Sequence, residues 1–229
     1  GTWARMARRT TPLEGGVTPC GSAGGVALGE KVRSFMLAGT ESGTEEFGLL
    51  ASEVFRHQFK SNPVYRRWCG HLGWTEKRAR DMAHWRDIPC MPVESFRWET
   101  IRTSDIAEAS GPIVFRTSGT TGSHRGEHHV HTPGLYQLSA VQGFQSNFGP
   151  PSDDGAVVFG LLPGYLERAD SSLGHMVGML RKVGWCEAGG APEDGFFLAD
   201  LERLFAAVEA AVAASRPVVL IGVTWAMVD

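Results

Sequence analysis

Three short apolar runs separated by helical patterns constrain the fold of this chain most strongly. The runs cover residues 113–115, 156–162 and 217–222, and the helical patterns cover residues 132–147, 171–183 and 198–214. Short apolar strands that alternate with helices are typical of a mainly parallel sheet with helices on both faces. The second half of the chain therefore predicts an α/β fold.

The preceding part of the chain predicts helices rather than strands. Ser42 and Glu45 fit a capping box, and apolar residues follow them at helical spacing. Asn62 followed by Pro63 is typical of an N-cap and a first helical turn, and Thr75 is a candidate cap for a third helix. We therefore expect a helical amino-terminal region in front of the sheet.

The domain organisation follows from a change in composition near residue 40. Residues 1–40 are rich in Gly, Ala, Thr and Arg without a sustained period, which predicts a flexible arm or linker. Residues 41–229 are predicted to form one α/β domain. Because an apolar run ends close to Asp229, we expect the chain to be a fragment whose domain continues beyond it.

The composition excludes several functional classes. Of the 229 residues, 42% are hydrophobic and 21% charged, which is ordinary for a globular protein. A net charge of -3 gives no basic surface for a nucleic acid, and no apolar run is long enough to span a membrane. The four cysteines are far apart and form no CxxC pair, as is usual for thiols in a reducing compartment. We therefore expect a cytoplasmic protein without a nucleic-acid partner.

The run FRTSGTTGSHRGEHHVH from Phe115 is the strongest functional signal. Between Thr117 and Gly126 it holds five hydroxyl side chains, three glycines and one arginine. The glycines allow positive φ angles and a close approach to a ligand, and successive backbone N–H groups form an anion-binding nest. Arg125 adds a guanidinium group suited to phosphate oxygens. The run therefore predicts a polyphosphate site, although it matches neither the Walker P-loop nor the dinucleotide fingerprint.

Two other groups of residues have competing interpretations. The histidines at 124, 128, 129 and 131 suggest a zinc site, but Glu127 is the only carboxylate among them and no cysteine is near. A polar segment beside the loop is the favoured interpretation. The tryptophans at 68, 74, 85 and 98 are expected to pack in a core or against another domain, because no basic residues surround them as in a nucleic-acid platform.

The motif RTSGTTGSHRG resembles the phosphate-binding signature TSGTTGxPKG of the acyl-adenylate-forming superfamily, with His124 and Arg125 where that signature has Pro-Lys. Three further stretches resemble LuxE-type acyl-protein synthetases, the long-chain-fatty-acid–luciferin-component ligases. They are EVFRHQFKSNPVYRRWC from Glu53, IPCMPVESFRWETI from Ile88 and LLPGYLERADSSLGHMV from Leu161. The stretches follow the order found in that family, and the resemblance covers about residues 45–229.

The resemblance implies the large amino-terminal domain of an adenylate-forming enzyme, in truncated form. It implies ATP-dependent activation of a carboxylic acid, usually a fatty acid, with Mg²⁺ as cofactor and transfer of the acyl group to a protein thiol. In this family an acyl reductase is the partner, and the product serves bioluminescence. The implied ligands of the β and γ phosphates are Thr117, Ser118, Gly119, Thr120, Thr121, Gly122 and Arg125.

The catalytic residues of such an enzyme are expected beyond Asp229, including the acceptor cysteine and a late lysine. Cys186 is therefore not predicted to be the nucleophile, since nothing in the sequence around it lowers its pKa.

Tyr165, Ser171, Ser172 and His175 are candidate substrate contacts, because they follow a predicted buried strand, where open α/β sheets place ligands. A helix that begins there would also favour a negatively charged acyl-adenylate. The alternative is that one serine only caps a helix and that His175 lies on its polar face.

Two other functional classes are compatible with the same loop motif and remain as alternatives. One is a phenylacetate-type aryl- or acyl-CoA ligase, which uses coenzyme A as acceptor, and the other is a catalytically inactive nucleotide-binding module.

Overall fold

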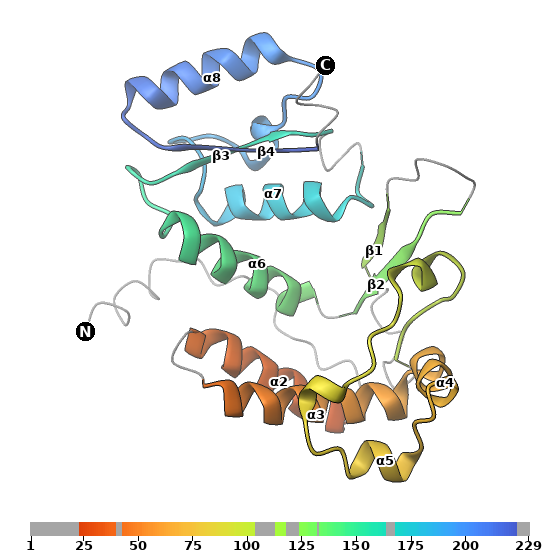
Figure 1. The fold of residues 1–229 in the computed structure, drawn as a ribbon. Coiled ribbons are helices and arrows are strands. Elements are labelled where there is room, and N and C mark those ends of the chain that lie inside the picture. The colour runs from red at the N-terminus through yellow and green to blue at the C-terminus, as the bar shows by residue number, and fades with distance from the viewer. Residues whose placement is uncertain are drawn as a thin grey trace. The chain divides into compact units, whose positions relative to one another are not determined.

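The computed structural model describes residues 23–39, 43–103, 113–117, 124–131, 133–163 and 168–223 (Figure 1). The chain divides into two compact units, each described by itself below. The first unit comprises the described residues up to Leu138, and the second comprises those from Ser139 onward. No helix in these described ranges has the length and apolar character needed to cross a membrane.

The first unit begins with helices. They are α2 (Ala23–Ala38), α3 (Thr44–Ser61), α4 (Pro63–His71), α5 (Glu76–Arg80) and the short 3-10 helices η2 (Trp85–Asp87) and η3 (Val93–Arg97). Their core contains Phe55, Phe59, Cys69, Trp74 and Ala79. The predicted helical amino-terminal region is therefore confirmed.

Side-chain caps separate these helices where the sequence predicts them. The Asn62 side chain accepts a hydrogen bond from the Tyr65 amide at 3.0 Å, and Pro63 is the first residue of α4. Thr75 Oγ1 accepts from the Arg78 amide at 3.2 Å and caps α5. Both predicted helix starts are confirmed, because each cap satisfies a backbone donor that the first helical turn leaves unpaired.

The amino-terminal boundaries differ from the prediction. α3 begins at Thr44 with Gly43 as its N-cap, two residues after the predicted cap Ser42, which lies outside the described residues. Residues 23–38, expected to be an irregular arm, form helix α2 because Ala, Leu, Glu, Lys and Met outweigh the three glycines in its sequence. The Phe35 ring of α2 lies 6.1 Å from the Phe47 ring of α3, which gives this helix a packing partner.

A β-hairpin completes the described part of the first unit. Strand β1 (Ile113–Arg116) pairs antiparallel with β2 (Glu127–Val130), with Ile113 opposite Val130 and Arg116 opposite Glu127. Helix α6 (Pro133–Phe148) follows and confirms the helical pattern predicted at residues 132–147. Strand β1 is confirmed, but the expectation of a mainly parallel sheet is wrong for this pair.

The second unit holds the parallel pair. Strand β3 (Val157–Leu161) pairs with β4 (Val218–Gly222), with Val157 opposite Val218. Helices α7 (Ser172–Val183) and α8 (Leu201–Ala213) lie on opposite faces of this pair (Figure 1), and the 3-10 helix η4 (Pro192–Gly195) lies between them in the sequence. The predicted strands and helices of this region are confirmed, except that α8 begins three residues later than expected, because Asp200 caps it.

Alternate side chains of β3 and that of Leu162, which follows it, supply the two cores of the second unit. Val158 and Leu162 pack with Val177, Leu180 and Trp185 on the α7 side. The other set packs with α8 and consists of Val157, Phe159 and Leu161 with Leu204 and Ala211. Because every residue of β3 is buried, its continuous apolar run is explained by coverage on both faces.

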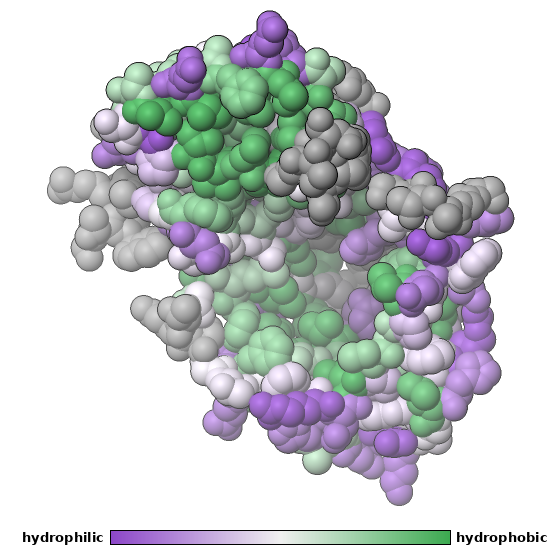
Figure 2. Space-filling view, turned by 45° about the horizontal axis from the view of Figure 1, so that its top comes forward, coloured by the Kyte–Doolittle hydropathy of each residue, from purple (hydrophilic) through white to green (hydrophobic). Residues whose placement is uncertain are grey.

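The outer surface of α8 and β4 retains apolar side chains. Leu201, Phe205 and Val212 of α8 and Leu220 of β4 are exposed. Apolar residues gather in the upper part of the face shown in Figure 2. The fold is thus a mixed α/β arrangement with one antiparallel and one parallel pair among the described residues.

Candidate functional site

The hydroxyl-rich run connects the two strands of the hairpin. At its neck, the Thr117 amide donates to the Gly126 carbonyl at 3.0 Å, and the Gly126 amide donates to Thr117 Oγ1 at 3.0 Å. Arg125 Nε donates to the Thr117 carbonyl at 2.6 Å, and its Nη2 reaches the Arg116 carbonyl at 3.4 Å. These bonds fix the two ends of the loop next to each other.

Of the predicted phosphate ligands, Thr117 and Arg125 are described and both belong to this neck. Ser118, Gly119, Thr120, Thr121 and Gly122 lie outside the described residues. The Arg125 guanidinium group uses Nε and Nη2 for backbone carbonyls, so its first role is to close the loop. Its positive charge remains at the loop base, where it attracts anions.

Gly126 has a different purpose from the one predicted. Its φ angle is not positive. A Cβ atom there would lie 3.3 Å from Thr117 Cγ2, 3.5 Å from the Phe96 carbonyl oxygen and 3.6 Å from Arg97 Cγ. Glycine therefore favours the close packing of the end of η3 against the neck, and the expectation of a positive φ is wrong here.

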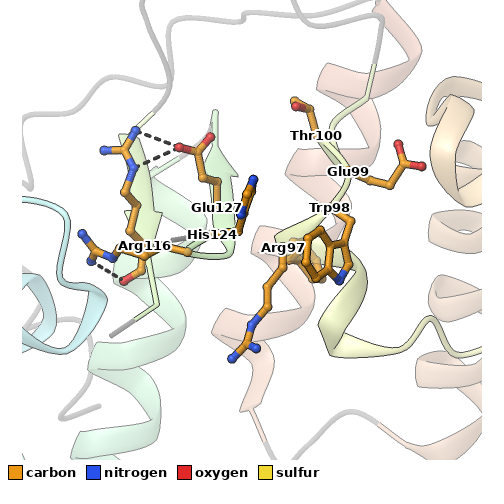
Figure 3. Close-up of a pocket in the computed structure, with 9 residues that line it drawn as sticks. Arg97, Trp98, Glu99, Thr100, Arg116, His124 and Glu127 are labelled. Carbon is orange, nitrogen blue, oxygen red and sulfur yellow. Dashed lines mark hydrogen bonds and ion pairs between the residues drawn. The ribbon is translucent and has the colours of Figure 1, made fainter. Parts of the chain in front are cut away.

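A pocket of about 550 Å³ lies beside the neck (Figure 3). It is lined by Phe96, Arg97, Trp98, Glu99, Thr100, Arg116, His124, Arg125 and Glu127. The residues from 96 to 100 come from the end of η3 and the segment after it, and the others come from the hairpin. All of them belong to the first unit.

The pocket walls carry three arginines and two glutamates. Arg116 Nε and Nη2 each lie 2.9 Å from Glu127 Oε1, and Glu99 pairs with Arg67 (Figure 3 shows the Arg116–Glu127 pair). Within the described ranges, Arg97 has neither a hydrogen bond nor an ion pair. Since both glutamates are neutralised by arginines, the pocket favours an anionic ligand.

Aromatic rings form one wall of the pocket. Trp98 is 71% exposed, and its ring centroid lies 5.4 Å from that of His124 with the planes tilted by 33°. Phe96 contacts His128 with its ring edge at a centroid distance of 5.6 Å. Trp74 is buried in the core as predicted, whereas Trp98 lies outside the core of its unit, so for this residue packing against another domain stays a prediction.

Two histidines of the cluster, His129 and His131, are partly buried. The ring nitrogens of His129 and His131 are inaccessible to solvent and make no hydrogen bond, and Glu127 Oε2 lies 3.5 Å from His129 Nε2. Burial lowers the pKa of His131, and the charges of His129 and Arg102 lower it further. Across the described residues, no three His, Cys, Asp or Glu side chains are placed to hold a metal ion. The zinc hypothesis gains no support from this geometry.

The predicted substrate contacts belong to the second unit. Ser171 Oγ accepts from the Gly174 amide at 3.1 Å, so Ser171 is the N-cap of α7, as the alternative interpretation states. Ser172 is exposed, and His175 is half-buried, with its pKa lowered by burial. Tyr165 lies outside the described residues. The structure thus gives Ser171 a structural role and leaves a substrate role for Ser172 and His175 as a prediction.

Cys186 lacks the environment of a reactive thiol. Burial raises its pKa, although the charges of Arg181 and Arg216 oppose this effect. Its backbone carbonyl accepts a hydrogen bond from Arg216 Nη1 at 3.0 Å. A thiol with a raised pKa is mostly protonated at neutral pH and is a poor nucleophile.

The sequence alone does not indicate this pocket, because the residues that line it are far apart in the chain. Arg97 and Trp98 stand in the stretch ESFRWET, and Arg116 and Glu127 flank the loop. The basic-aromatic pair at 97–98 is the one local signal that would have indicated a ligand site. The chain matches no protein-family model, and comparison with curated proteins and with solved structures finds no similar protein.

Proposed function

We propose that this chain binds ATP in an enzyme that activates a carboxylic acid as an acyl-adenylate and transfers the acyl group to a protein thiol. The observation that carries the proposal is the run TSGTTG in a loop whose neck is closed by Thr117 and Arg125. A closed neck supports the proposal because it holds the hydroxyl and N–H donors of one short loop together, as a polyphosphate requires.

In the proposed reaction, a carboxylate oxygen attacks the α-phosphorus of ATP and pyrophosphate leaves, giving an acyl-adenylate. A thiol sulfur then attacks the acyl carbon, its proton goes to a base, and AMP leaves. The loop from Thr117 to Gly122 is assigned to the β and γ phosphates, and Arg125 contributes positive charge while it holds the neck. Mg²⁺ would offset the phosphate charge, and its ligands are not assigned among the described residues.

The proposed substrate is a fatty acid, and an acyl reductase is the proposed protein partner, both by resemblance to LuxE-type synthetases. Stable acylsulfamoyl-adenosines, in which the acyl phosphate is replaced, test the substrate class without requiring turnover. We expect a long-chain analogue to bind more tightly than AMP. Tighter binding of a phenylacetyl analogue would favour the aryl-CoA ligase instead, and no gain from either acyl group would favour an inactive nucleotide-binding module.

Calorimetric titration with ATP tests the loop assignment directly. Thr120→Ala combined with Thr121→Ala should weaken ATP binding by about 100-fold or more, since two hydrogen bonds to a charged group are removed and each contributes about 1.5–3 kcal/mol. The matched control is Ser146→Ala, an exposed hydroxyl of α6, which should leave the affinity unchanged. Absence of ATP binding, or equal affinity in the loop double variant, would contradict the proposed function.

A further inference from the structure

The pocket beside the loop neck presents a large aromatic side chain to solvent. Trp98 is 71% exposed, although its neighbour Phe96 is half-buried against His128. His124 contacts the Trp98 ring at 5.4 Å, which limits the positions that the indole can take. An exposed, partly fixed indole is a suitable surface for a planar ligand, because the side chain loses little further freedom on binding.

The charges of the side chains around the pocket determine which planar ligands it favours. Arg97 has no ion pair or hydrogen bond within the described part of the chain, and it stands next to Trp98. Glu99 is neutralised by Arg67 and Glu127 by Arg116, so neither acid repels an anion from this wall. An aromatic platform beside an unpaired guanidinium group suits a planar ring that carries a negatively charged group.

The position of the platform links it to the loop. The Phe96 carbonyl and the Arg97 side chain border Gly126, the last residue of the loop, since a Cβ atom there would lie 3.5 Å and 3.6 Å from them, and His124 lies within the loop itself. The pocket volume of about 550 Å³ is within the range of nucleotide-sized sites. One ligand can therefore extend from the Trp98 ring to the neck that Arg125 closes.

We propose that this pocket binds the purine base of the nucleotide, stacked on the exposed face of Trp98, while the loop holds the phosphates. This inference rests on the proposed ATP-binding function and adds the location of the base. It follows that Trp98 contributes to affinity for ATP but not for a polyphosphate without a base.

Titration with two ligands distinguishes the contribution of the base to binding from that of the phosphates. ATP and inorganic tripolyphosphate are titrated calorimetrically into the wild-type chain and into Trp98→Ala, Trp98→Phe and Trp68→Phe. Trp68 is the matched control, because its indole Nε1 donates to the Cys90 carbonyl at 3.0 Å outside the pocket. Trp98→Ala should weaken ATP binding about tenfold and leave tripolyphosphate binding unchanged, and Trp98→Phe should retain most of the ATP affinity.

The outcomes distinguish the two proposals. Wild-type ATP affinity in Trp98→Ala, or an equal loss for ATP and tripolyphosphate, would overturn the base site and leave the phosphate loop standing. If neither ligand binds the wild-type chain, the proposed function fails and the base site fails with it. Quenching of wild-type fluorescence by adenosine alone, absent in Trp98→Phe, would support the base site independently.

Discussion

Arg181 offers the most quantitative test of how the second unit is held together. This side chain of α7 is 1% exposed, and its guanidinium group donates to the carbonyl oxygens of Val158, Ala191 and Pro192. Two further bonds of 3.0 Å reach the carboxylate oxygens of Glu187. Arg181→Met keeps the apolar stem and removes all of these bonds at once.

The expected loss is about 4 kcal/mol. Hydrogen bonds from a charged donor contribute about 1.5–3 kcal/mol each but are not additive, and removal of one partner of a buried ion pair costs about 3–5 kcal/mol. The Val158 carbonyl belongs to the fully buried strand β3, so it loses its Arg181 donor where water cannot replace it. Glu187→Gln should cost only about 1 kcal/mol, because that carboxylate is partly exposed and Arg181 keeps its three carbonyl acceptors.

Hydrogen exchange of the β3 amides, read by mass spectrometry, reports this unit separately from the first. Arg181→Met should reduce protection about a thousandfold and Glu187→Gln about fivefold. If the β3 amides of Arg181→Met were as protected from exchange as those of the wild type, or if the two variants had equal effects, the stabilising role of the hydrogen bonds from Arg181 to the backbone carbonyls would be refuted.

The same pair predicts a pH dependence. Burial raises the pKa of Glu187, but the hydrogen bonds from Arg181, a backbone hydrogen bond and the charges of Arg181 and Arg216 together lower it by more, so the net shift is downward. A lowered folded-state pKa gives stability that is present above the ordinary carboxyl range and is lost as the pH falls through the folded value. Protection of β3 in the wild type should therefore decrease in acid, and Glu187→Gln should show less of this decrease.

Three further predictions concern packing and thiol exposure. Gly195→Ala should destabilise the second unit nearly as much as Arg181→Met, because its Cβ would overlap the Arg181 guanidinium group, and the β3 exchange assay measures it. Gly126→Val should weaken ATP binding and lower the melting temperature more than Gly126→Ala does, since even the alanine Cβ would be tightly packed. Equal effects of the two variants would contradict the packing argument. Iodoacetamide at neutral pH should modify the exposed Cys90 before Cys186, whose pKa is raised, as peptide mapping would record.

The elements that the sequence predicts well are those set by local chemistry. Asn62 and Thr75 cap helices because their side-chain oxygens reach an amide three residues later. Ser171 does the same for α7. The apolar run at 157–161 predicts a buried strand, and the prediction is correct because both faces of this strand are covered.

The antiparallel hairpin was not predicted, because strand identity there depends on pairing. The residues of β2 read Glu-His-His-Val, which has none of the usual apolar pattern of a strand. Arg116 opposite Glu127 and Ile113 opposite Val130 stabilise the pair across the sheet. Such cross-strand pairs can be recognised in the sequence only when it is already known that the loop between the two strands reverses the chain direction.

His124 and Arg125 stand where the signature TSGTTGxPKG, which the loop motif resembles, has Pro-Lys, and the structure gives both residues contacts that a comparison of charge alone misses. A lysine offers one compact charge, whereas the Arg125 guanidinium fork reaches the carbonyls of both Thr117 and Arg116. The arginine therefore orders the neck while His124 supports the Trp98 ring. If the loop binds phosphate, its backbone and hydroxyl donors make the direct contacts, and Arg125 acts by holding them in position and by its charge. Lysine at position 125 would keep the charge and lose one carbonyl bond, so that substitution separates the two effects.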